Sequence, residues 1–169
     1  MSPQDELYES AVNEFGAALE RLARACEANP DERLELVHEI HIALWRSFER
    51  YEGRCSLRTW VYRVAHNVAA SHVARHVRSR TRTLVSLEDI DIADPADHER
   101  DLDERLTIER LIDLIRRLKP PDAQLMLLYL EDLDAATIGE VMGLSAGAVR
   151  VQIHRLKAIL KRRFLGAEA

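Results

Sequence analysis

The chain has 169 residues, of which 47% are hydrophobic, 5% aromatic and 31% charged, and its formal net charge is −5. This length can form one domain or two small ones with a hydrophobic core. No apolar run is long enough to span a bilayer, and no basic segment precedes an apolar run near Met1, so we expect a cytoplasmic protein without a secretory signal or membrane insertion. Cys26 and Cys55 lack the CxxC spacing and are expected to be reduced thiols.

The negative total charge conceals two basic segments. Residues 46–83 contain nine basic and two acidic residues, and residues 145–169 contain six and one. Residues 84–109, between them, contain two basic and ten acidic residues. Because phosphate contacts depend on local positive charge, each basic segment is a candidate nucleic-acid surface.

Apolar residues recur three or four positions apart, which predicts helices at 8–28, 34–48 and 57–80. The residues expected to face inward are, in chain order, Tyr8, Val12, Phe15, Leu19, Leu22 and Cys26; Leu34, Val37, Ile40 or His41, Leu44 and Phe48; and Leu57, Val61, Val64, Val68 and His72. No alternating strand pattern is found, so we expect an all-α protein.

Residues 86–103 are acidic, contain Pro95 and show weak periodicity, which predicts a partly disordered linker. A helical pattern resumes near Thr107, stops at Pro120-Pro121, and continues at 122–131. We therefore expect one helical domain at 1–82, an acidic flexible linker at 83–105, and a second helical domain at 106–169.

The last third of the chain predicts a helix-turn-helix. Asp134 and Ser145 can N-cap two short helices, Gly143 can adopt the positive φ of the turn, and Gly139 is a small residue where the helices cross. The expected shared core is Ile138, Met142, Leu144, Val149, Ile153 and Leu156, which leaves a basic outer face of Arg150, Val151, Gln152, His154, Arg155 and Lys157. The alternative is a helical hairpin with a solvated basic face.

The segment 54–78 is a second candidate nucleic-acid surface. Its basic and hydrogen-bonding side chains, expected on the loop or on the non-core face of the helix, are Arg54, Ser56, Arg58, Tyr62, Arg63, His66, Asn67, Ser71, Arg75 and Arg78. Trp60 and Tyr62 are candidates for stacking on an unpaired base, although Trp60 can equally pack in the core.

Both halves together resemble the extracytoplasmic-function (ECF) sigma factors of bacterial RNA polymerase. Residues 35–45 (E-L-V-H-E-I-H-I-A-L-W) are similar to the family pattern D-L-V-Q-E-V-F-x-x-x-W, and residues 51–67 are similar to F-x-G-x-S-x-F-x-x-W-L-Y-R-I-A-x-N. Residues 136–160 resemble the family's helix-turn-helix. The departures include histidines at 38 and 41, Ser71 in place of an acidic residue, and A-V-R-V-Q in place of T-V-K-S-R at 148–152.

The resemblance implies a transcription initiation factor that catalyses no reaction and needs no cofactor. Its expected partners are core RNA polymerase (the β′ clamp helices and the β flap), promoter DNA and, as a candidate, an anti-sigma factor. Polymerase binding is assigned to Glu35, Leu36, Val37, His38, Glu39, His41, Ile42 and Trp45. Minus-ten recognition and melting are assigned to Arg54, Ser56, Arg58, Trp60, Tyr62, Arg63, His66, Asn67, Arg75 and Arg78, and minus-thirty-five recognition to Arg150, Val151, Gln152, His154, Arg155 and Lys157.

Three other interpretations remain open to the sequence. A stand-alone dimeric helix-turn-helix regulator would bind a palindrome unaided, and a helical protein-interaction module would bind a regulator without touching DNA. A metal site is the third, because His38 and His41, and His72 and His76, are spaced to share a helical face. No cysteine or carboxylate set completes either pair in the sequence, so no metal is predicted.

Overall fold

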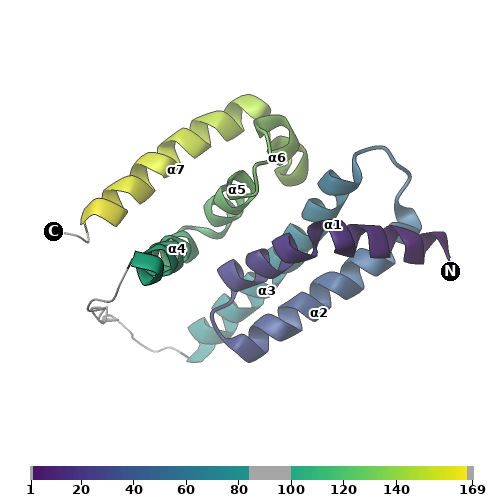
Figure 1. Cartoon of the computed structure of the whole chain (residues 1–169), viewed down its shortest axis with the longest axis horizontal. Coiled ribbons are helices and arrows are strands. Elements are labelled where there is room, and N and C mark those ends of the chain that lie inside the picture. Colours follow the sequence, from purple (N-terminus) through teal and green to yellow (C-terminus); the bar gives the residue numbers. More distant parts are fainter. Residues whose placement is uncertain (1, 84–99, 167–169) are drawn as a thin grey trace.

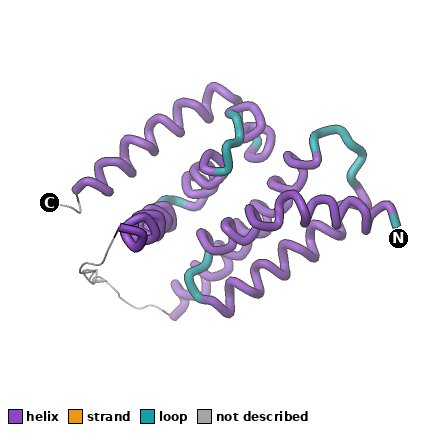
Figure 2. Tube along the Cα trace, in the orientation of Figure 1, coloured by secondary structure: helices purple, strands orange, loops and turns teal. Residues whose placement is uncertain are grey.

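The computed structural model describes residues 2–83 and 100–166, and every regular element in these two ranges is a helix (Figure 2). The predicted acidic linker falls mainly on residues 84–99, which lie outside the described residues. None of the described helices is long and apolar enough to cross a membrane. Both cysteines are free thiols, and burial raises the pKa of Cys26 to about 12, which keeps it protonated and unreactive.

The N-terminal domain is a bundle of three long helices, α1 (Pro3–Cys26), α2 (Pro30–Ser47) and α3 (Leu57–Thr83), with a short 3₁₀ helix η1 (Phe48–Arg50) after α2. Local sequence sets the starts of α1 and α2. Ser2 forms a capping box with Asp5, and Asn29 accepts hydrogen bonds from the first turn of α2. Both helices also begin with proline, whose missing N–H leaves nothing unsatisfied there.

The core of this domain confirms most of the expected inward positions and corrects the register of α2. Phe15, Leu19 and Leu22 of α1 and Val61 of α3 are buried as expected. On α2, however, the buried residues are Leu36, Ile40 and Leu44, whereas Leu34 is 59% exposed. The prediction for Leu34 was wrong because both leucines fit a helical spacing, and only the packing against α1 and α3 decides between them.

The C-terminal domain contains α4 (Arg100–Arg116), α5 (Pro120–Leu130), α6 (Ala135–Met142) and α7 (Ala146–Gly166). Helix α4 begins seven residues before the expected restart near Thr107. The buried core of the C-terminal domain is formed mainly by Ile115, Leu125, Leu128, Ile138, Val149 and Leu156. Leu144, expected in this core, is 42% exposed because it sits in the turn between α6 and α7.

The two domains pack directly against each other (Figure 1). Helix α1 contacts α4, and α3 contacts α5 and α6. Helix α2 lies on the outer side of the N-terminal bundle. Arg116 of α4 donates to two carbonyl oxygens at the end of α1, that of Ala25 at 3.2 Å and that of Arg24. Buried residues of both domains therefore form one continuous hydrophobic core.

Candidate nucleic-acid interface

The helix-turn-helix of α6 and α7 forms as the sequence predicts. The Asp134 carboxylate accepts from the Thr137 N–H at 2.7 Å, and the Ser145 hydroxyl accepts from the Ala148 N–H at 3.1 Å. Gly143 has a φ of +72°, which a residue with a Cβ adopts at a cost. A Cβ on Gly139 would lie 2.5 Å from the carbonyl oxygen of Leu144, so this glycine permits the close approach of the turn.

The outer face of α7 is only partly as expected. Arg150, Val151, His154 and Arg155 are exposed, and Val151, at 72%, is the most exposed large apolar residue among those that the structure describes. The other two predicted DNA-contacting residues, Gln152 and Lys157, contact side chains of α5. The Gln152 amide donates to Asp122 at 2.7 Å, and the Lys157 ammonium lies 5.3 Å from the ring centre of Tyr129.

Four of the predicted minus-ten residues line one pocket. Arg54, Ser56, Trp60 and Arg63 surround an open cavity of about 700 Å³, whose other wall is α6 through Thr137 and Glu140. Trp60 is half-buried, so it is neither a fully buried core residue nor a fully exposed ring for base stacking. Its indole N–H donates to the Ser47 hydroxyl at 2.9 Å and its ring packs 5.3 Å from that of Tyr51. The pocket is polar, with three arginines and two glutamates in its lining, and Arg54 is paired with Glu52 at 2.7 Å. Its arginines and the Trp60 ring suit a nucleotide phosphate or an unstacked base.

Two further predicted minus-ten residues, Arg58 and Tyr62, contact the C-terminal domain, as does Arg63 of the pocket. Arg58 donates to the carbonyl oxygen of Glu131 at 2.9 Å, and the Tyr62 hydroxyl lies 3.4 Å from the Glu131 carboxylate. Burial, reinforced by that carboxylate, raises the pKa of Tyr62 to about 12. Arg63 donates to the carbonyl oxygen of Glu140 at 2.9 Å. These contacts come from the C-terminal domain packing on α3, which the pattern of α3 alone cannot show.

The expectation that Tyr62 and His66 lie on an exposed face is wrong. They are 4% and 2% exposed, because α3 is covered on this side as well. Burial lowers the pKa of His66 to about 3, so this ring is neutral at physiological pH. Asn67 is exposed, and Arg75 is exposed but paired with Glu39 of α2 at 2.7 Å. The side chain of Arg78 lies outside the described residues.

An exposed stripe of three apolar side chains and one histidine runs along α2. We define the α2 stripe as Leu34, His38, Ile42 and Trp45, which are spaced to share one helical face and are all exposed, Ile42 by 51% and Trp45 by 43%. The Trp45 indole donates to Asp5 at 3.0 Å, and this hydrogen bond is the main reason that the pKa of Asp5 falls to about 2. Exposed large apolar side chains on one face are typical of a protein-binding surface.

The other predicted polymerase-binding residues divide by their position on α2. Glu35 is exposed, whereas Val37, Glu39 and His41 are half-buried, and the His41 ring is hydrogen-bonded to the Tyr8 hydroxyl at 2.8 Å. Burial, with His38 nearby, lowers the pKa of His41. Leu36 was wrongly placed on this surface, because it is fully buried in the core.

Sequence reasoning missed two residues of these surfaces. Leu34 was assigned to the core, although counting back from Trp45 in steps of three and four would have reached it. Glu131 received no role, yet it links the domains: its carboxylate accepts two hydrogen bonds from Arg21, both at 2.7 Å. These two residues are 110 positions apart, and no local pattern pairs them.

Comparison with protein-family models defines the class of protein. Residues 11–82 match sigma-70 region 2, which covers most of α1, all of α2 and nearly all of α3. Residues 108–160 match sigma-70 region 4, which includes the helix-turn-helix. The two domains therefore define a sigma-70-type transcription initiation factor.

Curated relatives narrow this class. The chain is 31% identical over 138 residues to the ECF RNA polymerase sigma-E factor of Haemophilus influenzae, which covers 76% of this chain and 72% of the relative. It is 30% identical over 127 residues to the ECF RNA polymerase sigma factor SigC of Mycobacterium tuberculosis, covering 75% and 66% of the two chains. The chain belongs to the ECF sigma factor family.

Two solved structures share the fold. The sigma factor RpoE, in complex with the anti-sigma factor NepR from Bartonella quintana, superposes with a TM-score of 0.70 at 15% identity, covering 96% of this chain and 98% of that one. CnrH, in complex with the cytosolic domain of CnrY, gives 0.68 at 18% identity, with 96% and 89% covered. At these identities the similarity establishes the fold alone.

Proposed function

We propose that this chain directs core RNA polymerase to specific promoters and assists melting of the minus-ten element, and that it catalyses no reaction itself. The observation that carries this proposal is the exposed α2 stripe, on a helix that lies on the outer side of the N-terminal bundle. A monomeric DNA-binding protein has no need for such a surface, whereas a dimeric regulator would use it for self-association, so the elution volume of the chain alone separates that alternative. A factor that must dock on polymerase needs one that stays accessible while both domains meet DNA.

The minus-thirty-five element would be read by the exposed face of α7. Arg150 and Arg155 are candidates for base or phosphate contacts in the major groove, with Val151 and His154 beside them. Gln152 and Lys157 would first have to leave Asp122 and Tyr129. We therefore assign them a smaller share of the recognition.

The minus-ten element would enter the pocket lined by Arg54, Ser56, Trp60 and Arg63. An extruded base would gain stacking and hydrogen bonds that offset its loss of base stacking in the duplex. Asn67, exposed one helical turn beyond Arg63, would contribute an amide to the same strand.

The packed arrangement of the domains restricts access to these residues. Arg58 and Arg63 donate to the Glu131 and Glu140 carbonyl oxygens, and α6 forms one wall of the pocket. We therefore propose that the domains separate before promoter DNA is bound. A partner that holds them together would keep the factor inactive, and an anti-sigma factor is the candidate for that role.

A pair of substitutions tests this division of labour. With holoenzyme on a promoter, Arg155→Ala should weaken closed-complex binding by ~1–3 kcal/mol if the guanidinium makes a bidentate base contact. Asn67→Ala should leave closed-complex binding unchanged and reduce open-complex formation, measured by permanganate reactivity of unpaired thymines. Equal losses in both steps for both variants would contradict the proposed roles.

A further inference from the structure

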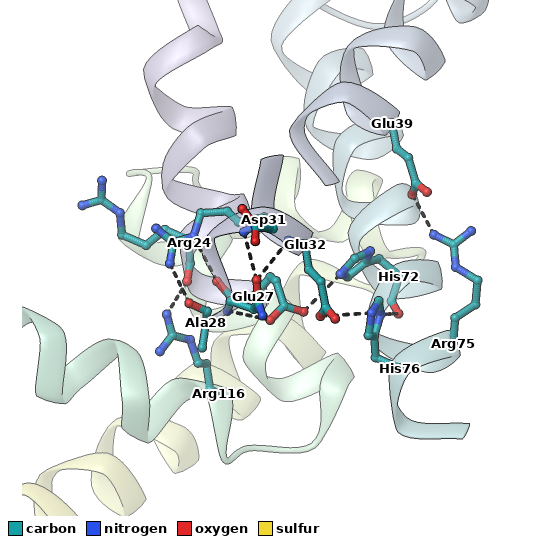
Figure 3. A network of polar contacts seen from close by, with 12 residues as sticks. Arg24, Glu27, Ala28, Asp31, Glu32, Glu39, His72, Arg75, His76 and Arg116 are labelled. Atoms are coloured by element: carbon teal, nitrogen blue, oxygen red, sulfur yellow. Dashed lines mark hydrogen bonds and ion pairs between the residues drawn. The ribbon is translucent and has the colours of Figure 1, made fainter. Parts of the chain in front are cut away.

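Four ionisable side chains meet where the end of α1 and the start of α2 face the second half of α3 (Figure 3). Glu27 follows α1, Glu32 lies in the first turn of α2, and His72 and His76 are one turn apart on α3. The Nε2 atom of His72 lies 3.2 Å from Oε2 of Glu27, and Nε2 of His76 lies 3.1 Å from Oε2 of Glu32. The sequence expectation that no carboxylates join this histidine pair is therefore wrong.

Both hydrogen-bonding partners of the His76 ring are acceptors. Its Nδ1 atom lies 3.0 Å from the carbonyl oxygen of His72, and because a carbonyl can only accept, Nδ1 carries the hydrogen. Its Nε2 atom lies 3.1 Å from the Glu32 carboxylate. In this geometry a cation between Nε2 and the carboxylate would satisfy both groups.

The other half of the cluster is deeply buried. Glu27 and His72 are 5% and 3% exposed. Oε1 of Glu27 accepts the Asn29 N–H at 2.9 Å, which directs Oε2 at His72. Burial of an isolated carboxylate is costly, and two carboxylates in one cluster add mutual repulsion. A divalent cation bound by two carboxylates and two neutral imidazoles would have no net charge.

We propose that Nε2 of His72, Nε2 of His76 and the carboxylates of Glu27 and Glu32 bind one divalent cation of the zinc class. Two imidazoles and two carboxylates form a four-ligand set that Zn²⁺ accepts in tetrahedral geometry. The ligand atoms of Glu27, His72 and His76 all lie within 4.8 Å of one another. Tetrahedral ligands at ~2.0–2.2 Å from zinc are about 3.4 Å apart, so these three atoms need only small shifts. The Glu32 carboxylate lies 3.1 Å from His76 Nε2 but outside that group of three, and it would rotate toward the ion to become the fourth ligand.

Two surroundings favour this assignment. The bond from His76 Nδ1 to a backbone carbonyl is the outer contact that commonly orients a metal-binding histidine and fixes its tautomer. A cavity of about 240 Å³ borders the cluster, and Glu27, His76 and Arg116 are among the residues that line it. The cation would fasten the ends of α1 and α2 to α3, beside the contact with α4.

Metal uptake by the full chain tests the proposal without polymerase or DNA. After treatment with EDTA and dialysis, the protein is titrated with Zn²⁺ in competition with a chromophoric chelator, and separately with Co²⁺. We expect one equivalent to bind, the visible absorption of tetrahedral Co²⁺, and a melting temperature that rises with free Zn²⁺. His76→Gln and Glu32→Gln should each weaken Zn²⁺ binding at least tenfold.

Asp31→Asn is the matched control for Glu32→Gln. Both substitutions remove one carboxylate from the first turn of α2, but only Glu32 faces the cluster. The control should therefore bind Zn²⁺ like the parent chain. The Glu32 side chain is 38% exposed, so its substitution should leave the fold intact, which circular dichroism verifies. No Zn²⁺ uptake by the parent chain, or equal affinity in the parent and Glu32→Gln proteins, would show that the cluster contains only buried ion pairs.

Discussion

Replacing Glu131 with glutamine is expected to loosen the contact between the two domains. The carboxylate accepts two parallel hydrogen bonds from the Arg21 guanidinium, both at 2.7 Å, and faces the Tyr62 hydroxyl. The contact is partly open to solvent, because the Arg21 side chain is 59% exposed and that of Glu131 is 18% exposed. Because water screens the two charges, we expect the ion pair to contribute only ~1 kcal/mol to the free energy of domain packing, despite the favourable bidentate geometry.

A loss of ~1 kcal/mol corresponds to an about fivefold shift from packed toward separated domains. If minus-ten binding requires separation, the apparent affinity for single-stranded DNA rises by the same factor while the packed form predominates. The assay is fluorescence anisotropy with a labelled single-stranded pool that is randomised at the central positions. Glu131→Gln should bind this pool about fivefold more tightly than the parent chain.

Asp132→Asn provides the matched control. It removes one negative charge from the exposed residue next to Glu131, and asparagine tolerates the positive φ of 57° at this position. Its affinity for the pool should stay close to that of the parent chain. Equal gains in Glu131→Gln and Asp132→Asn would show a general charge effect, and no gain in Glu131→Gln would refute the link between domain packing and DNA access.

Two further predictions concern stability. Because the folded-state pKa of His66 is about 3 against an ordinary value of 6.5, the unfolded chain takes up a proton first, and stability falls as pH drops below 6.5. Between pH 7.5 and 5.5, urea unfolding should show a loss of stability that is ~1.3 kcal/mol larger in the parent chain than in His66→Leu, and identical pH slopes would contradict the burial of this ring. Gly139→Ala should destabilise the helix-turn-helix by ~1–3 kcal/mol in the same assay, because its Cβ would meet the Leu144 carbonyl oxygen. Gly147→Ala has no atom within 4 Å and should instead stabilise α7 by ~0.5–1 kcal/mol, so an equal effect of both alanines would contradict the turn geometry.

Features set by neighbouring residues were predictable from the sequence. The caps at Asp134 and Ser145 and the positive φ of Gly143 depend on side chains within three positions, and all three are confirmed. The division of the chain into helices was also predictable, because the apolar spacing repeats over several turns. Family resemblance then identified the class of protein from motifs spread over both domains.

Features set by distant residues were not predictable. The choice between Leu34 and Leu36 for the core depends on how α2 is rotated against its neighbours, which the spacing of leucines does not determine. Glu131 meets partners in the other domain, and Glu27 meets His72 across 45 positions. For both glutamates the sequence shows a charged residue without its partner, because the partner is brought close only when the helices pack.

Binding to core RNA polymerase is the measurement that decides most directly whether this chain acts as a sigma factor. The purified chain is mixed with core enzyme and followed by size-exclusion chromatography. We expect stable co-migration, its loss in Ile42→Glu on the α2 stripe, and its retention in Leu165→Glu, since both side chains are about half exposed, at 51% and 52%. Failure of the parent chain to co-migrate with active core enzyme, especially if it elutes alone as a dimer, would contradict the proposed function and favour a stand-alone DNA-binding regulator.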